Sequence, residues 1–269
     1  MILRLKHPIS ILILGFVLLS GTACSDKDMK SLRSLFIEVP EQEAPAPPPE
    51  EKDAGKPVVR IKKRADGTVK SKIRYRYGVK DGLAEQWYDN GNMRASIEYK
   101  SGMRHGTAKM YYEKGGLFRE TEYQNDRKDG MMTIYRANGK VKAKIPYKNG
   151  HPGIGTQEFY VSGKAKTEYP ELLFDRINKL ASENRYLIEV ELSEKGRDAT
   201  FYYGQLIDGK YFHNGMIMLE TPEKEKGLLE ITLPPGTQVN ETLNIVAVAE
   251  TSMGNPYVVQ KELPVSIQN

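Results

Sequence analysis

The chain contains few of the residues from which disulfides and metal sites are usually built. Its 269 residues include one cysteine, Cys24, and four histidines, His7, His105, His151 and His213. A single cysteine excludes an intramolecular disulfide and a metal site built on cysteines. No histidine is spaced from another histidine or a carboxylate in a metal-binding pattern, so we expect no metal and no cofactor.

Catalytic motifs are also missing. The sequence has no G-x-S-x-G turn, no phosphate-binding loop and no H-E-x-x-H pair. Acidic residues such as Glu98 and Glu122 recur, but they fall on the predicted solvated face of strands. Since no nucleophile stands beside a base, we predict that the protein is not an enzyme. The small net charge of +5 does not favour nucleic acid as a partner.

Residues 1–23 have the composition of an export signal. A short basic region precedes an uncharged apolar run, 9–19, which is too short to span a membrane as a helix of the mature protein. The sequence up to Cys24 resembles a bacterial lipobox, although Gly21 stands where leucine is commoner. The resemblance implies a lipid on Cys24, and Ser25 in the next position favours the outer membrane. A soluble export signal with a chance cysteine is the alternative.

Residues 24–57 are predicted to form a tether. A brief apolar patch, 32–39, is followed by a segment of proline, alanine, glutamate and lysine. Proline at this density favours an extended, solvated backbone, so the segment should act as a semi-rigid spacer between the lipid and the folded part. The apolar patch is either a docking peptide or a segment that enters the bilayer interface.

A 24-residue repeat organises residues 58–169. Side chains of one kind recur at this period, which indicates a stacked array of one supersecondary unit. The columns are Gly67, Gly91, Gly115, Gly139 and Gly163; Trp87, Tyr111, Tyr135 and Phe159; and Tyr75, Tyr99, Tyr123 and Tyr147.

Each unit is predicted to be a strand, a tight turn, a second strand and a looser turn. Asn90-Gly91 favours a two-residue hairpin because both residues tolerate positive φ. Along the following strand, Met93, Ala95 and Ile97 alternate with polar residues, which predicts an antiparallel meander with one solvated face. We interpret the column of Trp87 as the packing spine, because a hairpin alone buries too little area.

Residues that vary between the copies are the candidates for binding. Tyr88, Tyr112 and Tyr160 alternate to the face opposite the column of Trp87, where they suit an exposed surface, although Arg136 interrupts the set. Basic residues in the strands and looser turns complete the predicted binding set, which is Tyr88, Tyr112, Arg94, Arg104, Arg119 and Arg127.

The units resemble the MORN-repeat variant family, including its bacterial YwqK type. The matching residues are Gly82, Trp87, Tyr88, Gly91, Tyr99 and Gly102, then Gly106, Tyr111, Tyr112, Gly115 and Tyr123, then Gly130, Tyr135, Gly139, Tyr147 and Gly150, then Phe159, Tyr160 and Gly163. The resemblance implies an elongated β-ribbon that contacts proteins or lipids and, in some YwqK-type members, an antitoxin role. The departures include Asp126 in a glycine column and Pro146, which predicts a sheet edge or a bulge.

Residues 170–269 read as a separate all-β domain. Six or seven short strands separated by Gly and Pro turns predict an antiparallel sandwich of immunoglobulin-like type. Residues 171–182 fit a short helix or a connecting strand.

The whole chain is therefore expected to be all-β and non-enzymatic. Our first hypothesis is a lipid-anchored envelope protein, in the outer membrane, whose ribbon and sandwich bind another envelope protein. The alternative is a YwqK-type antitoxin or immunity protein that neutralises a toxin, which a toxin-like neighbouring reading frame would favour.

Overall fold

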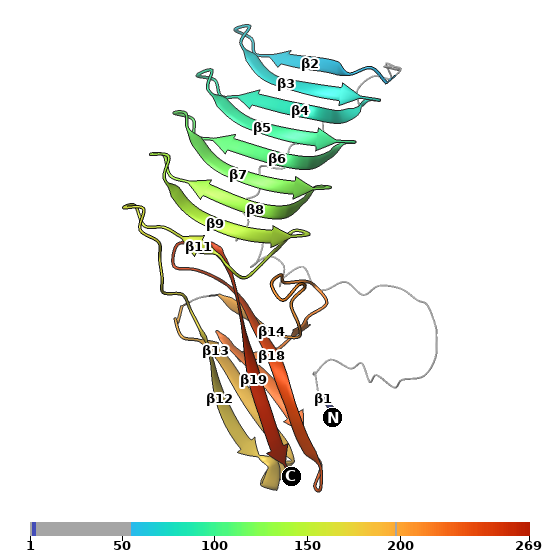
Figure 1. The fold of residues 1–269 in the computed structure, drawn as a ribbon, viewed down its shortest axis with the longest axis vertical. Coiled ribbons are helices and arrows are strands. Elements are labelled where there is room, and N and C mark those ends of the chain that lie inside the picture. The colour runs from blue at the N-terminus through green and yellow to red at the C-terminus, as the bar shows by residue number, and fades with distance from the viewer. Residues whose placement is uncertain (1, 4–54, 197) are drawn as a thin grey trace.

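The computed structural model describes residues 2–3, 55–196 and 198–269, and these residues form an all-β protein (Figure 1). A ribbon of stacked strands leads into a sandwich of two smaller sheets. The predicted signal and tether, with Cys24, lie outside the described residues, apart from Ile2–Leu3 and 55–57. Within the described residues, no helix is long and apolar enough to cross a lipid bilayer.

The ribbon is one ten-stranded antiparallel sheet in which spatial order follows chain order. Its full strands are β2 (Val58–Lys63), β3 (Val69–Arg76), β4 (Val79–Trp87), β5 (Met93–Lys100), β6 (Met103–Tyr111), β7 (Leu117–Gln124), β8 (Arg127–Tyr135) and β9 (Val141–Lys148). Two short strands, β10 (His151–Pro152) and β11 (Gln157–Glu158), share the last edge of β9. This is the predicted single-layer meander, two strands per repeat.

The turn after each Trp87-type residue is longer than predicted. The Tyr88 amide donates to the Asn92 carbonyl (2.8 Å) and the Gly91 amide to the Tyr88 carbonyl (3.1 Å). Gly91 has φ +84°, and the ladder shifts register after Gln86. These features define a three-residue loop with a glycine bulge. The prediction of a two-residue turn at Asn90-Gly91 was wrong because only the glycine takes positive φ.

The tight two-residue turns lie at the opposite edge, where the sequence predicted looser ones. Both central residues have positive φ at Ser101-Gly102 (50° and 87°) and at Asn125-Asp126 (49° and 65°), as hairpin turns of this length require. Asp126 tolerates the glycine position because aspartate enters the left-handed region more readily than most residues. Its carboxylate also accepts hydrogen bonds from the backbone amide and Nε of Arg104, both at 2.9 Å.

The two faces of the ribbon differ. On one face, which we call the tyrosine face, cross-strand partners form a buried row: Ala84, Ile97, Ala108, Thr121, Met132 and Ile145. Beside this row stands the column of Tyr75, Tyr99, Tyr123 and Tyr147, in which Tyr123 and Tyr147 are 7% and 1% exposed. The other face, which we call the tryptophan face, carries Trp87, Tyr111 and Tyr135.

The packing spine is therefore the tyrosine column and not the column of Trp87. Trp87, Tyr111, Tyr135 and Phe159 are all only partly buried. The earlier interpretation was wrong because each of the first three follows an inward residue in the strand, namely Gln86, Met110 or Ile134, and alternation turns the next side chain outward. Pro146 lies in β9 where the pairing partner changes from β10 to β11, which agrees with the predicted edge.

The C-terminal part has the strand order of an immunoglobulin-like sandwich. The strands are β12 (Leu172–Lys179), β13 (Arg185–Leu192), β14 (Ala199–Tyr203), β15 (Ile217–Met218), β16 (Glu220–Glu223), β17 (Lys226–Thr232), β18 (Gln238–Glu250) and β19 (Pro256–Gln268). One sheet runs β12-β13-β17-β16 and the other β15-β14-β18-β19, which corresponds to the ABED and CFG sheets of that fold, with one added short strand.

The core of the sandwich lies between its two sheets. Ile188, Phe201, Ile231 and Ile245 are among its least exposed side chains. Residues 171–182, for which helix and strand were both possible, form strand β12 and then the short helix α2 (Leu180–Glu183). The outer edge of β17 pairs with β16 and also with β1 (Ile2–Leu3).

Candidate interaction surfaces

The tryptophan face is a mixed aromatic and charged surface. A cross-strand row on this face runs Lys72, Glu85, Ser96, Lys109, Glu120, Thr133 and Lys144. Lys109 pairs with Glu120 (3.5 Å), and the Tyr135 hydroxyl lies 3.5 Å from the same carboxylate. Burial, together with the Glu120 carboxylate, raises the pKa of Tyr135. The rings therefore stand among paired charges at a partly exposed surface.

Tyr88 and Tyr112, which the sequence placed among the binding residues, link neighbouring repeats through their hydroxyls. The Tyr88 hydroxyl donates to the Tyr111 carbonyl (2.9 Å) and the Tyr112 hydroxyl to the Tyr135 carbonyl (2.7 Å). In the same column, Arg64 donates to the Trp87 carbonyl (2.5 Å) and Arg136 to the Phe159 carbonyl (2.7 Å). Arg136 therefore donates the same kind of hydrogen bond to the next repeat as Tyr88 and Tyr112 do, and it does not interrupt their column.

The tyrosine face carries a column of cations on its rings. Each tyrosine has a cation over it: Arg60 on Tyr75 (4.9 Å), Lys80 on Tyr99 (4.8 Å), Arg104 on Tyr123 (4.5 Å) and Lys128 on Tyr147 (4.6 Å), measured to the ring centroids. Lys80, Arg104 and Lys128 keep the repeat spacing. Burial first, and then Arg119 and Arg104, lower the pKa of Lys128 to about 8.

The four predicted binding arginines do not form one surface, because only Arg104 and Arg119 lie on the tyrosine face. Arg94 is exposed beside the Tyr88 ring (5.8 Å), and Arg127 is exposed at the start of β8. Arg104 belongs to the cation column, and Arg119 is only 6% exposed on the tyrosine face. The burial of Arg119 could have been predicted from the 24-residue register, because the register places Arg119 in the inward column of Ala95 and Ala143.

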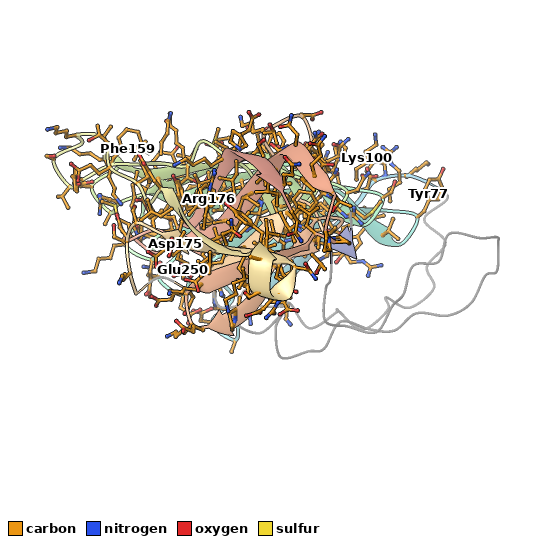
Figure 2. All side chains as sticks on the ribbon, turned by 90° about the horizontal axis from the view of Figure 1, so that it is seen from below. Tyr77, Lys100, Phe159, Asp175, Arg176 and Glu250 are labelled. Carbon is orange, nitrogen blue, oxygen red and sulfur yellow. The ribbon has the colours of Figure 1, made fainter. Side chains whose placement is uncertain are left out.

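The two edges of the ribbon face opposite sides of the molecule. Figure 2 shows Tyr77, in the first two-residue turn, on one side, and Phe159, next to the last three-residue loop, on the other. Tyr77 is 73% exposed.

Sequence reasoning missed a buried charged group where the ribbon meets the sandwich. Glu158 is fully buried, and its carboxylate accepts hydrogen bonds from Thr251 and Asn255 of the sandwich. Lys166 Nζ lies 3.7 Å from the other carboxylate oxygen. The register places Glu158 in the inward column of Met110 and Ile134, which is the signal that could have found it.

Backbone and ring contacts complete this junction. The Ile154 amide donates to the Lys210 carbonyl (2.9 Å), and the Phe212 amide donates to the Pro152 carbonyl (3.1 Å). The ring of His151 contacts Phe212 edge to face (5.7 Å), and its pKa is lowered, chiefly by burial. The last repeat is thus joined to the sandwich by hydrogen bonds as well as by packing.

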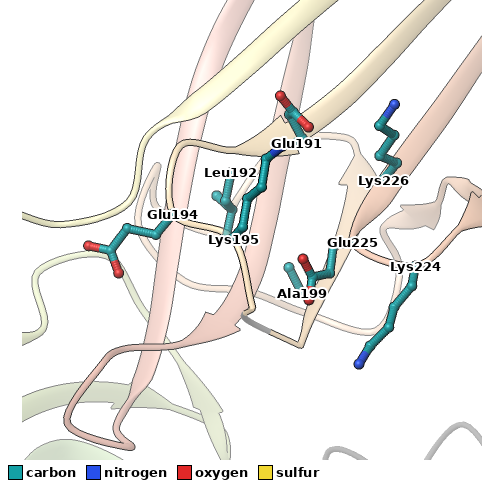
Figure 3. A pocket seen from close by; sticks show the side chains of 8 residues that line it. All are labelled: Glu191, Leu192, Glu194, Lys195, Ala199, Lys224, Glu225 and Lys226. Carbon is teal, nitrogen blue, oxygen red and sulfur yellow. The ribbon is translucent and has the colours of Figure 1, made fainter.

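The described residues offer no concentrated chemical site. They contain no group of three or more His, Cys, Asp or Glu side chains that could hold a metal ion. Figure 3 shows the residues that line a small pocket of the sandwich, most of them charged, such as Glu191, Lys195 and Lys224. Its volume of about 110 Å³ is below the range of typical small-molecule sites.

The fold places this protein in an architectural class, that of an antiparallel β-repeat ribbon fused to a β-sandwich. Within the ribbon, a family model described as the MORN repeat variant matches three consecutive units, residues 80–101, 104–125 and 128–149. These residues are MORN repeats of the variant type, which indicates a repeat-based binding scaffold. Comparisons with curated proteins and with solved structures gave no match.

Proposed function

We propose that the protein is a non-enzymatic, lipid-anchored scaffold of the cell envelope that binds another envelope protein through the tryptophan face. The observation that carries this proposal is the column of Trp87, Tyr111 and Tyr135, partly exposed on a single-layer sheet. Aromatic residues are enriched in protein interfaces, and large aromatic side chains supply much of their binding energy.

The surroundings of the column support a protein partner. Leu83 and Met131 are 40% and 37% exposed and point to the same face, because each precedes an inward residue of its strand. Lys109 and Glu120 form a charged pair whose carboxylate lies 3.5 Å from the Tyr135 hydroxyl. An apolar strip with charged neighbours provides contact area at its centre and polar complementarity at its margins.

Chemical cross-linking in intact cells, with the full chain as bait, tests this proposal. We expect Tyr111→Ala to lower partner recovery by about tenfold or more, as for a central aromatic contact. Tyr77→Ala, an exposed aromatic at the turn edge, is the matched control and should bind like wild type. If the Tyr111→Ala chain recovered as much partner as wild type, binding through the tryptophan face would be refuted. Recovery of a toxin would favour the immunity function.

The same cells test the anchor. A Cys24→Ala chain should leave the membrane fraction, because the proposed acyl chains supply the attachment. Unchanged fractionation would refute lipid attachment at Cys24.

A further inference from the structure

A row of exposed cations lies on β3, the strand next to the outermost strand β2 of the ribbon. The side chains of β3 alternate between partly buried and exposed positions, and each exposed position holds a basic residue. We call these residues the basic row: Lys70, Lys72, Arg74 and Arg76. Because they alternate with Ile73 and Tyr75 of the tyrosine face, the basic row lies on the tryptophan face.

The basic row has little negative charge beside it. Among the described residues, Lys72 is the one member of the row with an ion pair, to Glu85 at 4.0 Å. Neighbouring cations of the row repel one another, since alternate residues of a strand stand about 6.7 Å apart. A positive row of this kind attracts an anionic ligand to the tryptophan face.

The basic row is confined to the first hairpin. In the 24-residue register, Glu98 and Glu122 stand where β3 has Arg74, and both are exposed. A broad anionic surface, such as a bilayer, would meet these carboxylates as well as the row. A ligand that is one strand wide and lies along β3 would meet the cations without them. The charges therefore favour a narrow, elongated ligand.

The spacing of the row fits an extended peptide. Such a peptide presents every second side chain on one side, at the same interval of about 6.7 Å. Carboxylates at alternate residues of the peptide would thus each face one cation of the row. A segment of about seven residues, roughly 20 Å long, spans the whole row. The ligand that fits best is an extended acidic segment of a protein.

Apolar side chains and a fixed arginine support binding at this place. Val59 and Ile61 of β2 pair with Arg74 and Lys72 and are 45% and 54% exposed, so they offer apolar contact beside the charges. A Cβ on Gly82 would come 2.7 Å from the Arg74 Cδ. The arginine stem therefore lies against the backbone of β4, and a side chain already held in place loses less entropy on binding.

We infer that the basic row binds an extended acidic segment of the protein partner, with carboxylates at alternate residues facing the four cations. This inference rests on the proposed function, because the row lies on the same face as the column of Trp87, on the strand next to β4. It adds to that function the charge and the conformation of the segment that the partner presents.

Fluorescence anisotropy of labelled peptides with the purified full chain tests this inference. The probe is a short peptide in which glutamate alternates with alanine. Its isomer carries the same residues as one block of glutamate and one of alanine. We expect the alternating peptide to bind about fivefold more tightly, because the block isomer turns half of its glutamates away from the row, and high salt should release it. Equal affinities, or no binding, would overturn the inference.

Two variants with the same change of charge locate the binding site. Arg74→Gln with Arg76→Gln removes two exposed cations of the row and should weaken binding of the alternating peptide by about fivefold, since two ion pairs are lost. Lys142→Gln with Lys144→Gln removes two cations of β9 and should leave the affinity unchanged. Equal effects of the two variants would show attraction by net charge alone and refute binding at the row.

Vesicles of an anionic phospholipid distinguish a protein segment from a membrane. With the Cys24→Ala chain, which lacks the proposed lipid, added vesicles should not release the bound peptide. Release by the vesicles would assign the row to a lipid surface and overturn the inference.

The peptide experiment and the cell experiment fail separately. If the peptide does not bind but Tyr111→Ala lowers partner recovery, the inference alone is wrong. If the peptide binds at the row but Tyr111→Ala has no effect in cells, the proposed function alone is wrong.

Discussion

At the residue scale, the ribbon holds positively charged side chains at buried or partly buried positions, where loss of hydration disfavours the charge. Arg119 occupies a column otherwise filled by Ala95 and Ala143, and it is 6% exposed. Lys128 lies over the Tyr147 ring, with Arg119 and Arg104 close enough to disfavour its charge. Buried cations seldom add to stability, so we expect both residues to lower the stability of the ribbon.

Lys128 makes stability depend on pH. Its pKa is lowered to about 8 in the folded chain, against 10.5 for an ordinary lysine. Between these two pKa values the unfolded chain binds more protons than the folded chain, so the free energy of unfolding rises with pH through this window. Below the window, the full destabilisation caused by charged Lys128 is present. Lys128→Met removes this destabilisation but also the contact of Lys128 with the Tyr147 ring. The net effect should raise the free energy of unfolding at pH 7 by about 1–2 kcal/mol and flatten its rise with pH.

Urea unfolding at several pH values measures both effects. Lys109→Met, a lysine of the tryptophan face paired with Glu120, is the control and should change stability at pH 7 by less than about 1 kcal/mol. A Lys128→Met chain that is less stable than wild type at pH 7 would show that the cation is a net stabiliser.

At the element scale, each hairpin is tied to the next by a side chain that reaches a backbone carbonyl. Arg64, Tyr88, Tyr112 and Arg136 make this bond in successive repeats. Two residue types with different shapes serve one position because the requirement is a donor of sufficient reach. Identity within a column is therefore not needed for the ribbon to propagate.

Removing one such donor should weaken one interface between repeats. Tyr112→Phe leaves the Tyr135 carbonyl without this partner and should cost about 1 kcal/mol. Amide hydrogen exchange should accelerate most in the loops at 112–116 and 136–140. Tyr160→Phe, in the last unit and 47% exposed, is the control. Faster exchange spread evenly over the ribbon would contradict a local link.

The sequence predicted the elements better than their faces. The period located the strands of the ribbon and the alternation within them, because both depend on local hydrophobic pattern. It misassigned the two turn types, since Asn-Gly also fits a three-residue loop with a glycine bulge. It also chose Trp87 over Tyr99 as the spine, because a column of large aromatic residues looks alike on either face.

The junction was beyond sequence reasoning for a different reason. Glu158 meets Thr251 and Asn255 across more than ninety residues, and no periodicity links the ribbon to the sandwich. The predicted binding residues failed to converge for a related reason. Variation between repeats identifies positions at which packing between the repeats does not fix the residue type, but it does not show that these positions lie on one surface.

At the scale of the whole molecule, the ribbon is a one-dimensional array closed at one end. Each repeat contacts its neighbours, and the sandwich covers the end at β9 through β10, β11 and Glu158. The other end is β2, whose Arg60, Lys62 and Lys63 place charge on the outer strand and oppose pairing with another sheet edge. The long faces, not the ends, are thus left for binding.

Site-specific photo-cross-linking in intact cells tests most directly whether the tryptophan face is the binding surface. A photoreactive residue replaces Lys109, which lies two residues from Tyr111 and pairs with Glu120 on that face, or Asn149, in an exposed two-residue turn. We predict that position 109 yields one discrete partner adduct and that position 149 yields none. Adducts at position 149 without any at position 109 would contradict the account.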